Sequence, residues 1–393
     1  MTTRAYLDHN ATAPVRPEAA AAVMRALSLV GNPSSVHGEG RRAHALIEEA
    51  RADVARLVGA KPAEVIFTSG GTEAANLAIH SAVAALGVER LIISAIEHDC
   101  VRASAAASGL PVDILPVDNN GVADLAALGA LLAKPGKALV ALMLANNETG
   151  IIQPVGGASA LAHEAGALLL SDTIQAAGRI SIDMKALGAD MVLLSAHKIG
   201  GPQGVGALVL REGLAFDPLI RGGGQEKRRR AGTENVAGIA GFGAAARLAL
   251  GDEALMPELA RLRDKLESAL CAVASDVVVF GADVQRLPNT SLFAASGLVS
   301  ETLIVALDLD GLAVSAGSAC SSGKVTRSHV LAAMGVAEDL AGGAIRVSLG
   351  SGNTDADIDK FVAGWSRYVA RARGKTQHTK ANAIPSAFAE VEH

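Results

Sequence analysis

Short apolar segments alternate with alanine-rich, helix-like segments over residues 17–250, and this alternation restricts the possible fold more than any other feature of the chain. Near-continuous apolar strands separated by helices are typical of a mostly parallel sheet with helices on both faces. Seven segments have the composition of such strands: residues 65–68, 91–94, 113–116, 139–144, 168–171, 191–194 and 206–210. We therefore expect an α/β domain with a mostly parallel, seven-stranded sheet.

The pattern of the chain changes after Gly251. Two helix-like and three strand-like segments follow in the order 257–273, 277–280, 290–293, 300–308 and 345–349. They predict a smaller α+β domain. We expect residues 15–252 to form the large domain, and residues 1–14 and 253–374 to form the small domain that carries the cysteine loop described below. Residues 375–393 lack periodicity, which predicts a disordered tail.

The charge and cysteine content of the chain disfavour several classes of function. The net charge is −5, so we expect neither nucleic acid nor an anionic membrane as a partner. The three cysteines are widely spaced, which indicates neither a disulfide framework nor a zinc site and fits a reducing cytoplasm. We also expect no membrane span and no signal peptide, because no apolar run approaches the roughly 18 residues of a span. Small metabolites are the expected partners.

Two polar side chains, Asp172 and Lys198, follow neighbouring predicted strands. In open α/β sheets, ligands bind beyond the carboxyl ends of the strands, so these two groups are expected to converge on one ligand. A lysine that condenses with an aldehyde and an aspartate that keeps a pyridine nitrogen protonated are the groups that pyridoxal phosphate requires. The two residues therefore suggest a pyridoxal phosphate site.

Loops after other predicted strands carry further candidates. Residues 69–73 open a helix, so the backbone at Gly71 and the Thr72 hydroxyl can surround a phosphate, although a Gly-Gly turn is also common between a strand and a helix. His98 can stack on a flat cofactor ring and move protons, or it can be an exposed loop histidine. Asn147 can orient a substrate carboxylate or a ring oxygen of the cofactor, or it can serve only in a turn.

The second half of the chain holds two more candidates. Arg346 lies within a strand-like run, where a buried guanidinium requires an anion such as a substrate carboxylate. Cys320 lies in a Gly-, Ser- and Ala-rich segment that predicts a mobile, exposed loop, where a reactive thiol can reach a substrate and then a partner. The basic run within residues 222–235 lacks interleaved aromatic residues, so we interpret it as a solvated or anion-binding loop at a subunit boundary.

Over residues 6–371, the chain resembles the cysteine desulfurases of the nitrogen-fixation and iron–sulfur-cluster type, which belong to the class V aminotransferases and to the fold-type I pyridoxal phosphate enzymes. The resemblance rests on residues 7–12 (LDHNAT), 31–37 (GNPSSVH), 67–73 (FTSGGTE), 146–148 (NNE), 172–175 (DTIQ), 195–198 (SAHK), 230–235 (RAGTEN) and 317–320 (GSAC). It implies a fold-type I architecture and a homodimer.

The resemblance also implies a role for each candidate residue. Lys198 would be the Schiff-base lysine, Asp172 would contact the pyridine nitrogen and Gln175 the ring hydroxyl, with His98 stacked on the ring. Four residues would hold the phosphate, the last from the neighbouring subunit: Thr72, Ser195, His197 and Thr233. Asn147 and Arg346 would bind the substrate carboxylate.

The implied reaction converts L-cysteine to L-alanine. Lys198 moves the α-proton, and the Cys320 thiolate takes the sulfur as a persulfide, with His98 as a candidate base. A sulfur-acceptor protein such as an iron–sulfur scaffold would then receive it. No intrinsic metal is expected, although Cys320 could transiently ligate a nascent iron–sulfur cluster. A selenocysteine lyase, another class V aminotransferase and a non-catalytic protein with the same fold are the alternatives, and a mobile thiol argues against transamination.

Overall fold

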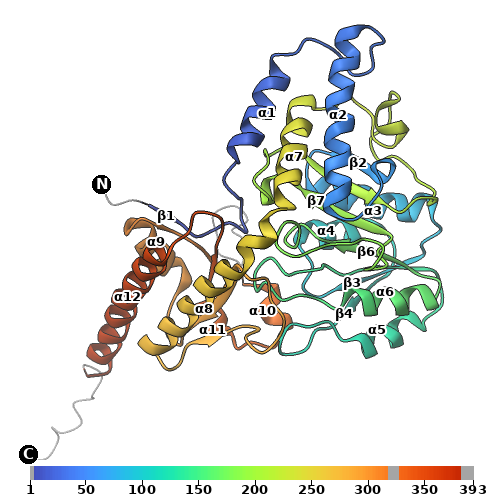
Figure 1. The fold of residues 1–393 in the computed structure, drawn as a ribbon. Helices are drawn as coiled ribbons and strands as arrows, with labels where there is room; N and C mark the ends of the chain where they lie inside the picture. Colours follow the sequence, from blue (N-terminus) through green and yellow to red (C-terminus); the bar gives the residue numbers. More distant parts are fainter. Residues whose placement is uncertain (1–3, 317–326, 382–393) are drawn as a thin grey trace, which may run out of the picture.

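A computed structural model describes residues 4–316 and 327–381 of the chain (Figure 1). Its largest sheet has seven strands in the order β2-β8-β7-β6-β5-β3-β4. The bounds of these strands are Val65–Thr68 (β2), Arg90–Ser94 (β3), Val112–Leu115 (β4), Ala138–Ala141 (β5), Leu168–Asp172 (β6), Met191–Ser195 (β7) and Gly206–Leu210 (β8). Only β8 runs antiparallel to its neighbours, which confirms the expected mostly parallel seven-stranded sheet.

Helices cover both faces of this sheet because successive strand residues point to opposite sides. In β7, Val192 and Leu194 pack under one group of helices, whereas Met191 and Leu193 pack under another. The first group is α1 (Pro17–Leu27), α2 (Gly38–Leu57), α5 (Leu125–Leu132), α6 (Val155–Glu164) and α7 (Val236–Ala249). The second is α3 (Gly71–Ala85) and α4 (Asp99–Ala107). The fold is that of an α/β protein with a doubly covered sheet.

Small residues allow α1, α2 and α7 to pack closely as a projecting bundle (Figure 1). A Cβ atom at Gly243 in α7 would lie only 2.5 Å from the Cα atom of Ala50 in α2. The low aromatic content of the chain, 3%, is compatible with a dense core because alanine and glycine reduce the distance between the helices.

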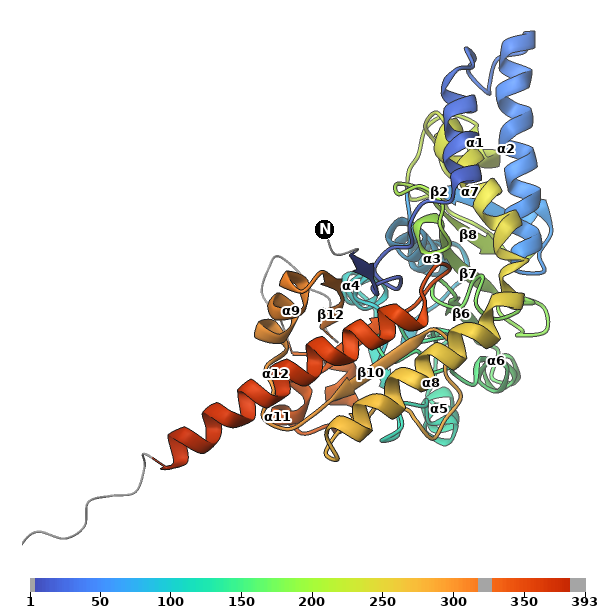
Figure 2. The ribbon, with the colours of Figure 1, turned by 60° about the vertical axis from the view of Figure 1, so that its left-hand side comes forward.

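A smaller α+β part follows the large sheet. Its four-stranded antiparallel sheet has the order β12 (Ser315–Ala316), β13 (Ile345–Ser348), β10 (Thr290–Ala294) and β9 (Val278–Val279). On one face lie α8 (Met256–Val273) and α12 (Asp355–Ala381), which run side by side (Figure 2), and α9 (Ser300–Leu309) packs into the same cluster. Ala5 and Leu7 join this cluster, and β1 (Ala5–Tyr6) pairs with β11 (Leu312–Ala313).

The other face of the small sheet packs against the large part. Leu292 of β10 contacts a cluster that includes Ile96 and Met143 from the large part and Leu331 of α10 (His329–Ala333). The remaining short helices are α11 (Glu338–Ala341) and the 3₁₀ turns η1 (Pro62–Glu64), η2 (Ala196–Lys198), η3 (Gln225–Arg228) and η4 (Asp252–Leu255). The expected domain boundaries at residues 14–15 and 252–253 stay a prediction. Strand β1 and helix α8 lie entirely within the ranges expected for the small domain.

The C-terminal end differs from the expectation. Helix α12 continues to Ala381, so the disordered tail that we expected from residue 375 is wrong for residues 375–381. Residues 375–381 lack the apolar periodicity that would predict a helix from the sequence. They extend a helix that is nucleated by the packing of Phe361 and Trp365. Residues 382–393 lie outside the described residues. None of the described helices is both long and apolar enough to cross a membrane.

Candidate active site

A cavity of about 380 Å³ lies at the carboxyl ends of β6 and β7, where the two parts of the molecule meet. Ten of the residues predicted from the sequence line it: Gly71, Thr72, His98, Asn147, Asp172, Gln175, Ser195, His197, Lys198 and Arg346. Residues at or after the carboxyl ends of β2, β3, β5, β6 and β7, residues of β12 and β13, and the N-terminal segment therefore meet around one space. This is the position at which an open α/β sheet binds its ligand.

Asp172 ends β6 and is buried. Its Oδ1 atom accepts a hydrogen bond from the backbone N–H of Ile174 at 2.9 Å. Burial raises the pKa of Asp172, while the nearby His98 and Lys198 act in the opposite direction. The Oδ2 atom has no hydrogen-bond partner among the described residues, so one carboxylate oxygen is available to a cationic ligand group in the cavity.

Lys198 lies in η2, the turn directly after β7. Its Nζ atom donates to the backbone oxygens of Asn10 at 2.6 Å and Ala11 at 2.9 Å. Burial, together with the positive charges of Arg346 and Arg179, lowers the pKa of Lys198 to about 8. A substantial fraction of this amine is therefore neutral and nucleophilic near neutral pH, unlike that of an ordinary surface lysine.

The start of α3 forms one end of the cavity. A Cβ atom at Gly71 would lie 2.3 Å from the Cδ1 atom of Ile174, so a larger residue here would require the Ile174 side chain to shift. Thr72 follows Gly71 in the first turn, and Ser195 and His197 line the same side. Burial and the charge of Lys198 lower the pKa of His197 to about 4, so this ring is neutral at physiological pH. Helix N–H groups and neutral donors suit a phosphate.

His98 is the N-cap residue of α4. Its Nδ1 atom accepts the backbone N–H of Cys100 at 3.1 Å and lies 3.0 Å from the Cys100 Sγ atom. A ring that accepts at Nδ1 carries its proton at Nε2. Burial raises the pKa of the Cys100 thiol, which therefore stays protonated and lines the cavity as a small apolar group. The fixed His98 ring thus forms one wall of the cavity.

Arg346 faces the cavity because its neighbours in β13, Ile345 and Val347, pack on the opposite side against α8 and α12. Its Nη2 atom donates to Asp8 Oδ1 at 2.7 Å, and its Nη1 atom donates to the Asn147 backbone oxygen at 2.9 Å. The Nε atom is buried without a hydrogen-bond partner. Asn147 and Arg346, predicted to act on the same substrate group, are in direct contact.

Gln175 connects the cavity to the N-terminal segment. Its Nε2 atom donates to the Asn10 backbone oxygen at 3.0 Å, and its Oε1 atom accepts from Arg179 at 2.6 Å. Hydrogen bonds at both amide atoms therefore fix the orientation of the Gln175 side chain, which forms part of the cavity wall.

Several cavity residues were not assigned by the sequence analysis. Asn10 and Ala11 hold Lys198, Ser315 lines the cavity, and Ser315 Oγ donates to Asp8 at 2.7 Å. Residues 7–12 stand out in the sequence as a polar run after a short strand, but nothing local connects them to a lysine far along the chain. Only the tertiary fold brings them together.

Two predicted site residues are not placed in the cavity. Thr233 is exposed and does not line the cavity of its own chain. Cys320 lies outside the described residues; β12 ends at Ala316, next to Ser315 on the cavity wall. Among residues 4–316 and 327–381, no group of three or more histidine, cysteine or acidic side chains could hold a metal ion.

Comparison with known proteins agrees with this geometry. The family model described as aminotransferase class-V matches residues 5–361. A cysteine desulfurase from Cereibacter sphaeroides is 47% identical over 366 residues, which cover 91% of this chain and 94% of that protein. The cysteine desulfurase IscS from Dictyoglomus turgidum is 40% identical over 380 residues, 95% of this chain and 96% of that protein.

Solved structures lead to the same group. The NifS-like protein from Rickettsia africae superimposes with a TM-score of 0.86 at 36% sequence identity, and the match covers 93% of this chain and 99% of that one. Both the sequence and the structural matches extend over nearly the whole molecule. The chain therefore belongs to the class V aminotransferase family and, within it, to the cysteine desulfurases.

Proposed function

We propose that this protein uses pyridoxal phosphate to convert L-cysteine to L-alanine and transfers the sulfur first to Cys320 and then to an acceptor protein such as an iron–sulfur scaffold. The observation that carries the proposal is the convergence of Lys198, Asp172 and Arg346 on one cavity. An amine with a lowered pKa, a buried carboxylate and a carboxylate-binding guanidinium are the groups that this reaction requires.

The residues around the cavity fit pyridoxal phosphate. The volume of about 380 Å³ lies within the range of about 300–1,000 Å³ that is usual for small-molecule sites. The first turn of α3 with Thr72, Ser195 and His197 would hold the phosphate, and the free Oδ2 atom of Asp172 would face the ring nitrogen. When bound, the cofactor supplies an electron sink for the substrate Cα atom.

The other side chains act on the substrate. Arg346 has a buried Nε atom without a partner, which supports a substrate carboxylate beside Arg346 and Asn147. The low pKa of Lys198 supports a role in taking the α-proton and later returning a proton to the alanine product. His98, with its proton on Nε2, would pack against the cofactor ring.

Sulfur transfer requires a nucleophilic thiolate in addition to the residues that act with the cofactor. In the proposed step, the Cys320 thiolate attacks the sulfur of the bound substrate, so an S–S bond forms as the C–S bond breaks. The electron pair of the broken bond stays with the substrate carbon, which takes up a proton and becomes the methyl group of alanine. Nearby cationic groups or a base such as His98 would favour the thiolate, since a free cysteine has a pKa of about 8.5. A reducing compartment such as the cytoplasm would keep this thiol available.

We also propose a homodimer in which Thr233 completes the phosphate site of the neighbouring subunit. Thr233 is exposed and does not line the cavity of its own chain, which supports a role in another copy. The projecting tip between α1 and α2 exposes large apolar side chains, including Leu27, Val30 and Val36. Exposed apolar groups of this kind are typical of an interface.

The test is to incubate the cofactor-loaded protein with L-cysteine without a reductant and analyse both products. We expect L-alanine in the solution and one added sulfur atom on the Cys320 peptide by mass spectrometry. In a second assay with a reductant that releases the sulfur as sulfide, the Cys320→Ser variant should still bind the cofactor and L-cysteine but produce almost no sulfide. Cys271→Ser, which changes an exposed cysteine, should behave as the wild type. A keto acid product with retained sulfur would indicate transamination, and activity restricted to L-selenocysteine would indicate a lyase.

A further inference from the structure

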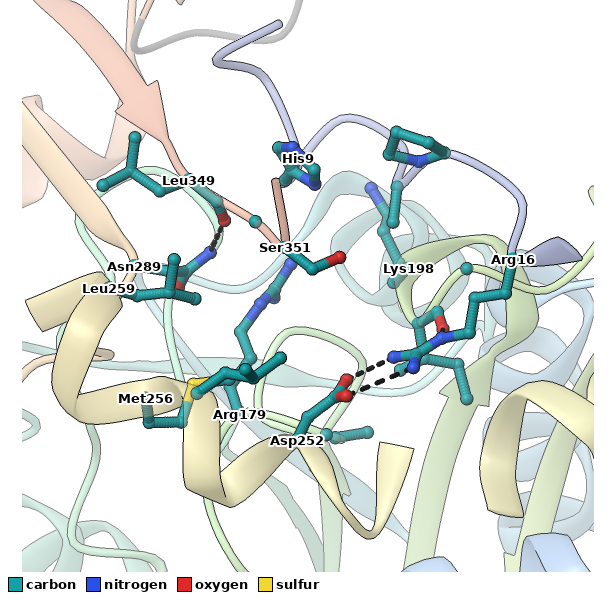
Figure 3. A pocket seen from close by; sticks show the side chains of 18 residues that line it. His9, Arg16, Arg179, Lys198, Asp252, Met256, Leu259, Asn289, Leu349 and Ser351 are labelled. Atoms are coloured by element: carbon teal, nitrogen blue, oxygen red, sulfur yellow. Dashed lines mark hydrogen bonds and ion pairs between the residues drawn. The ribbon is translucent and has the colours of Figure 1, made fainter. Parts of the chain in front are cut away.

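A second, smaller cavity lies on the other side of Lys198, between the N-terminal segment, the turn after β6 and the start of α8 (Figure 3). Its volume is about 100 Å³, which is enough for a few water molecules or a small ion but not for an amino acid substrate. Lys198 lines both cavities, and its role in the proposed reaction has already been given. What distinguishes the small cavity is Arg179.

Arg179 is a buried cation that forms no ion pair within residues 4–316 and 327–381. It is 8% exposed, and its Nη1 atom donates to the backbone oxygen and the Oε1 atom of Gln175 at 2.5 and 2.6 Å. Its Nε and Nη2 atoms make no hydrogen bond to any described residue, and no described carboxylate forms an ion pair with it. Figure 3 shows the Arg179 side chain extending into the cavity, with the Ser351 hydroxyl in the same space.

The one carboxylate among the lining residues does not neutralise Arg179. Asp252 forms a two-point ion pair with Arg16, whose Nη1 atom lies 3.1 Å from Asp252 Oδ1 (Figure 3). Asp252 acts on Arg179 only at a distance, through a small Coulombic effect that raises the Arg179 pKa, and forms its ion pair with Arg16. Burying a charge without a partner is costly, so the free N–H donors of Arg179 are expected to attract an anion.

The neighbouring basic groups respond to this positive charge. Burial and Arg179 lower the pKa of His9 to about 4, against the smaller effect of Asp8, so the ring is neutral at physiological pH. Arg179 also contributes to the low pKa of Lys198. A guanidinium remains charged under these conditions even though burial lowers the pKa of Arg179 to about 10.

We propose that this cavity is a binding site for a small inorganic anion of halide size, held by the free N–H donors of Arg179. The guanidinium supplies the charge, and the Ser351 hydroxyl can supply a further donor. The volume of about 100 Å³ is too small for a nucleotide. The site is separate from the proposed phosphate site at α3, which lies in the larger cavity.

Bromide is the probe for the test. Crystals of the cofactor-loaded protein grown or soaked in sodium bromide should show an anomalous bromide peak next to Arg179. In solution, bromide should raise the thermal unfolding temperature in a saturable manner, relative to sodium gluconate at equal ionic strength. The absence of a peak in this cavity, or a peak without saturable stabilisation in solution, would overturn the proposal.

Two variants and one control connect the effect to Arg179. Arg179→Gln should lose both the peak and the bromide-specific stabilisation. Arg179→Lys retains the charge with fewer fixed donors, so it should require a several-fold higher bromide concentration for half-maximal stabilisation. This variant provides the test if Arg179→Gln does not fold. Arg286→Gln removes a buried arginine that is paired with Glu267 outside the cavity and should keep the full bromide effect. Equal bromide dependence in all variants would contradict the proposal.

Discussion

At the scale of single residues, burial and neighbouring charge determine how each group can react. Burial and then the positive charges of Arg346 and Arg179 lower the pKa of Lys198 to about 8, against the opposing charges of Asp172 and Asp8. Two nearby histidines, His9 and His197, are held neutral chiefly by burial. The proposed chemistry depends on these environments more than on residue type alone.

The first prediction concerns Lys198→Ala. The variant should fold and bind pyridoxal phosphate, because the proposed phosphate and ring contacts come from other residues, but the cofactor should be removed by dialysis. Turnover of L-cysteine should fall by at least roughly 10²–10⁴-fold, the usual contribution of a proton-transferring group. Visible absorbance after dialysis and alanine production are the measurements. The exposed Lys185→Ala variant is the control, and wild-type absorbance and turnover in Lys198→Ala would show that the assignment is wrong.

A second prediction concerns pH-dependent stability. Burial lowers the pKa of folded His9 to about 4, below the ordinary histidine value of about 6.5, so the unfolded chain binds a proton first as the pH falls. His9 therefore costs stability progressively between pH 6.5 and 4, by an amount on the order of 3 kcal/mol when the full shift is expressed.

The His9→Gln variant should lose less stability than the wild type over that pH window. Urea titrations at pH 7 and pH 4.5 measure the free energy of unfolding of both proteins. Replacement of exposed His44 by glutamine provides the control, since it should leave the slope unchanged. Parallel loss of stability in His9→Gln and the wild type would exclude a perturbed His9.

At the scale of secondary structure elements, close approaches between chain segments hold the site together. The start of α3 lies against the loop after β6, where a Cβ atom at position 71 would displace the end of the Ile174 side chain. β13 directs Arg346 into the cavity because alternate residues of the strand are committed to the core under α8 and α12. Each site residue is thus oriented by an element whose other face is packed.

The third prediction tests the contact of α3 with Ile174. Gly71→Ala should destabilise the protein by roughly 1–3 kcal/mol, as overpacking usually does, and weaken cofactor binding by shifting the loop that carries Asp172. Ile174→Val removes the Cδ1 atom that the new methyl group would meet. The double variant should therefore recover much of both losses, which thermal unfolding and cofactor titration would measure. Simple additivity of the two substitutions would refute the contact.

At the scale of the whole molecule, the proposed catalytic cavity depends on both parts of the chain. The large sheet contributes Asp172 and Lys198, the small sheet contributes Arg346, and the N-terminal segment crosses between them with Asn10 and Ala11. Ser328, which follows the segment that carries Cys320, is held by a 2.6 Å hydrogen bond to the buried Glu148 next to Asn147. The proposed dimer would add Thr233 to this assembly.

The fourth prediction separates a shared site from a site within one chain. If Thr233 acts in the neighbouring subunit, mixing the Lys198→Ala and Thr233→Ala chains creates heterodimers with one intact site. We expect tight cofactor binding and sulfide production to recover in the mixture at limiting cofactor, although neither variant has both properties alone. Sedimentation at micromolar concentration should show a dimer. No recovery in a mixture that exchanges subunits would place Thr233 outside the shared site.

The local sequence determined the secondary structure elements, which have a short-range period of apolar residues. All seven strands of the large sheet, the smaller α+β part and the positions of Asp172 and Lys198 follow from hydrophobic periodicity, because side-chain burial alternates with the geometry of strands and helices. Parallel strands bring their carboxyl ends to one edge, so those two residues could be expected to meet. The roles given to Gln175 and Thr233 came from resemblance rather than from such patterns.

Only the tertiary structure decided which distant segments meet. Asn10 and Ala11 bind Lys198, and Asp8 binds Arg346, across long separations in sequence that no local period encodes. The same is true of Arg179, an ordinary arginine in the sequence that becomes a buried cation facing a cavity because the segments around it leave no carboxylate free. Charge pairing, desolvation and cavity shape depend on distances through space, and these arise only when the whole chain packs.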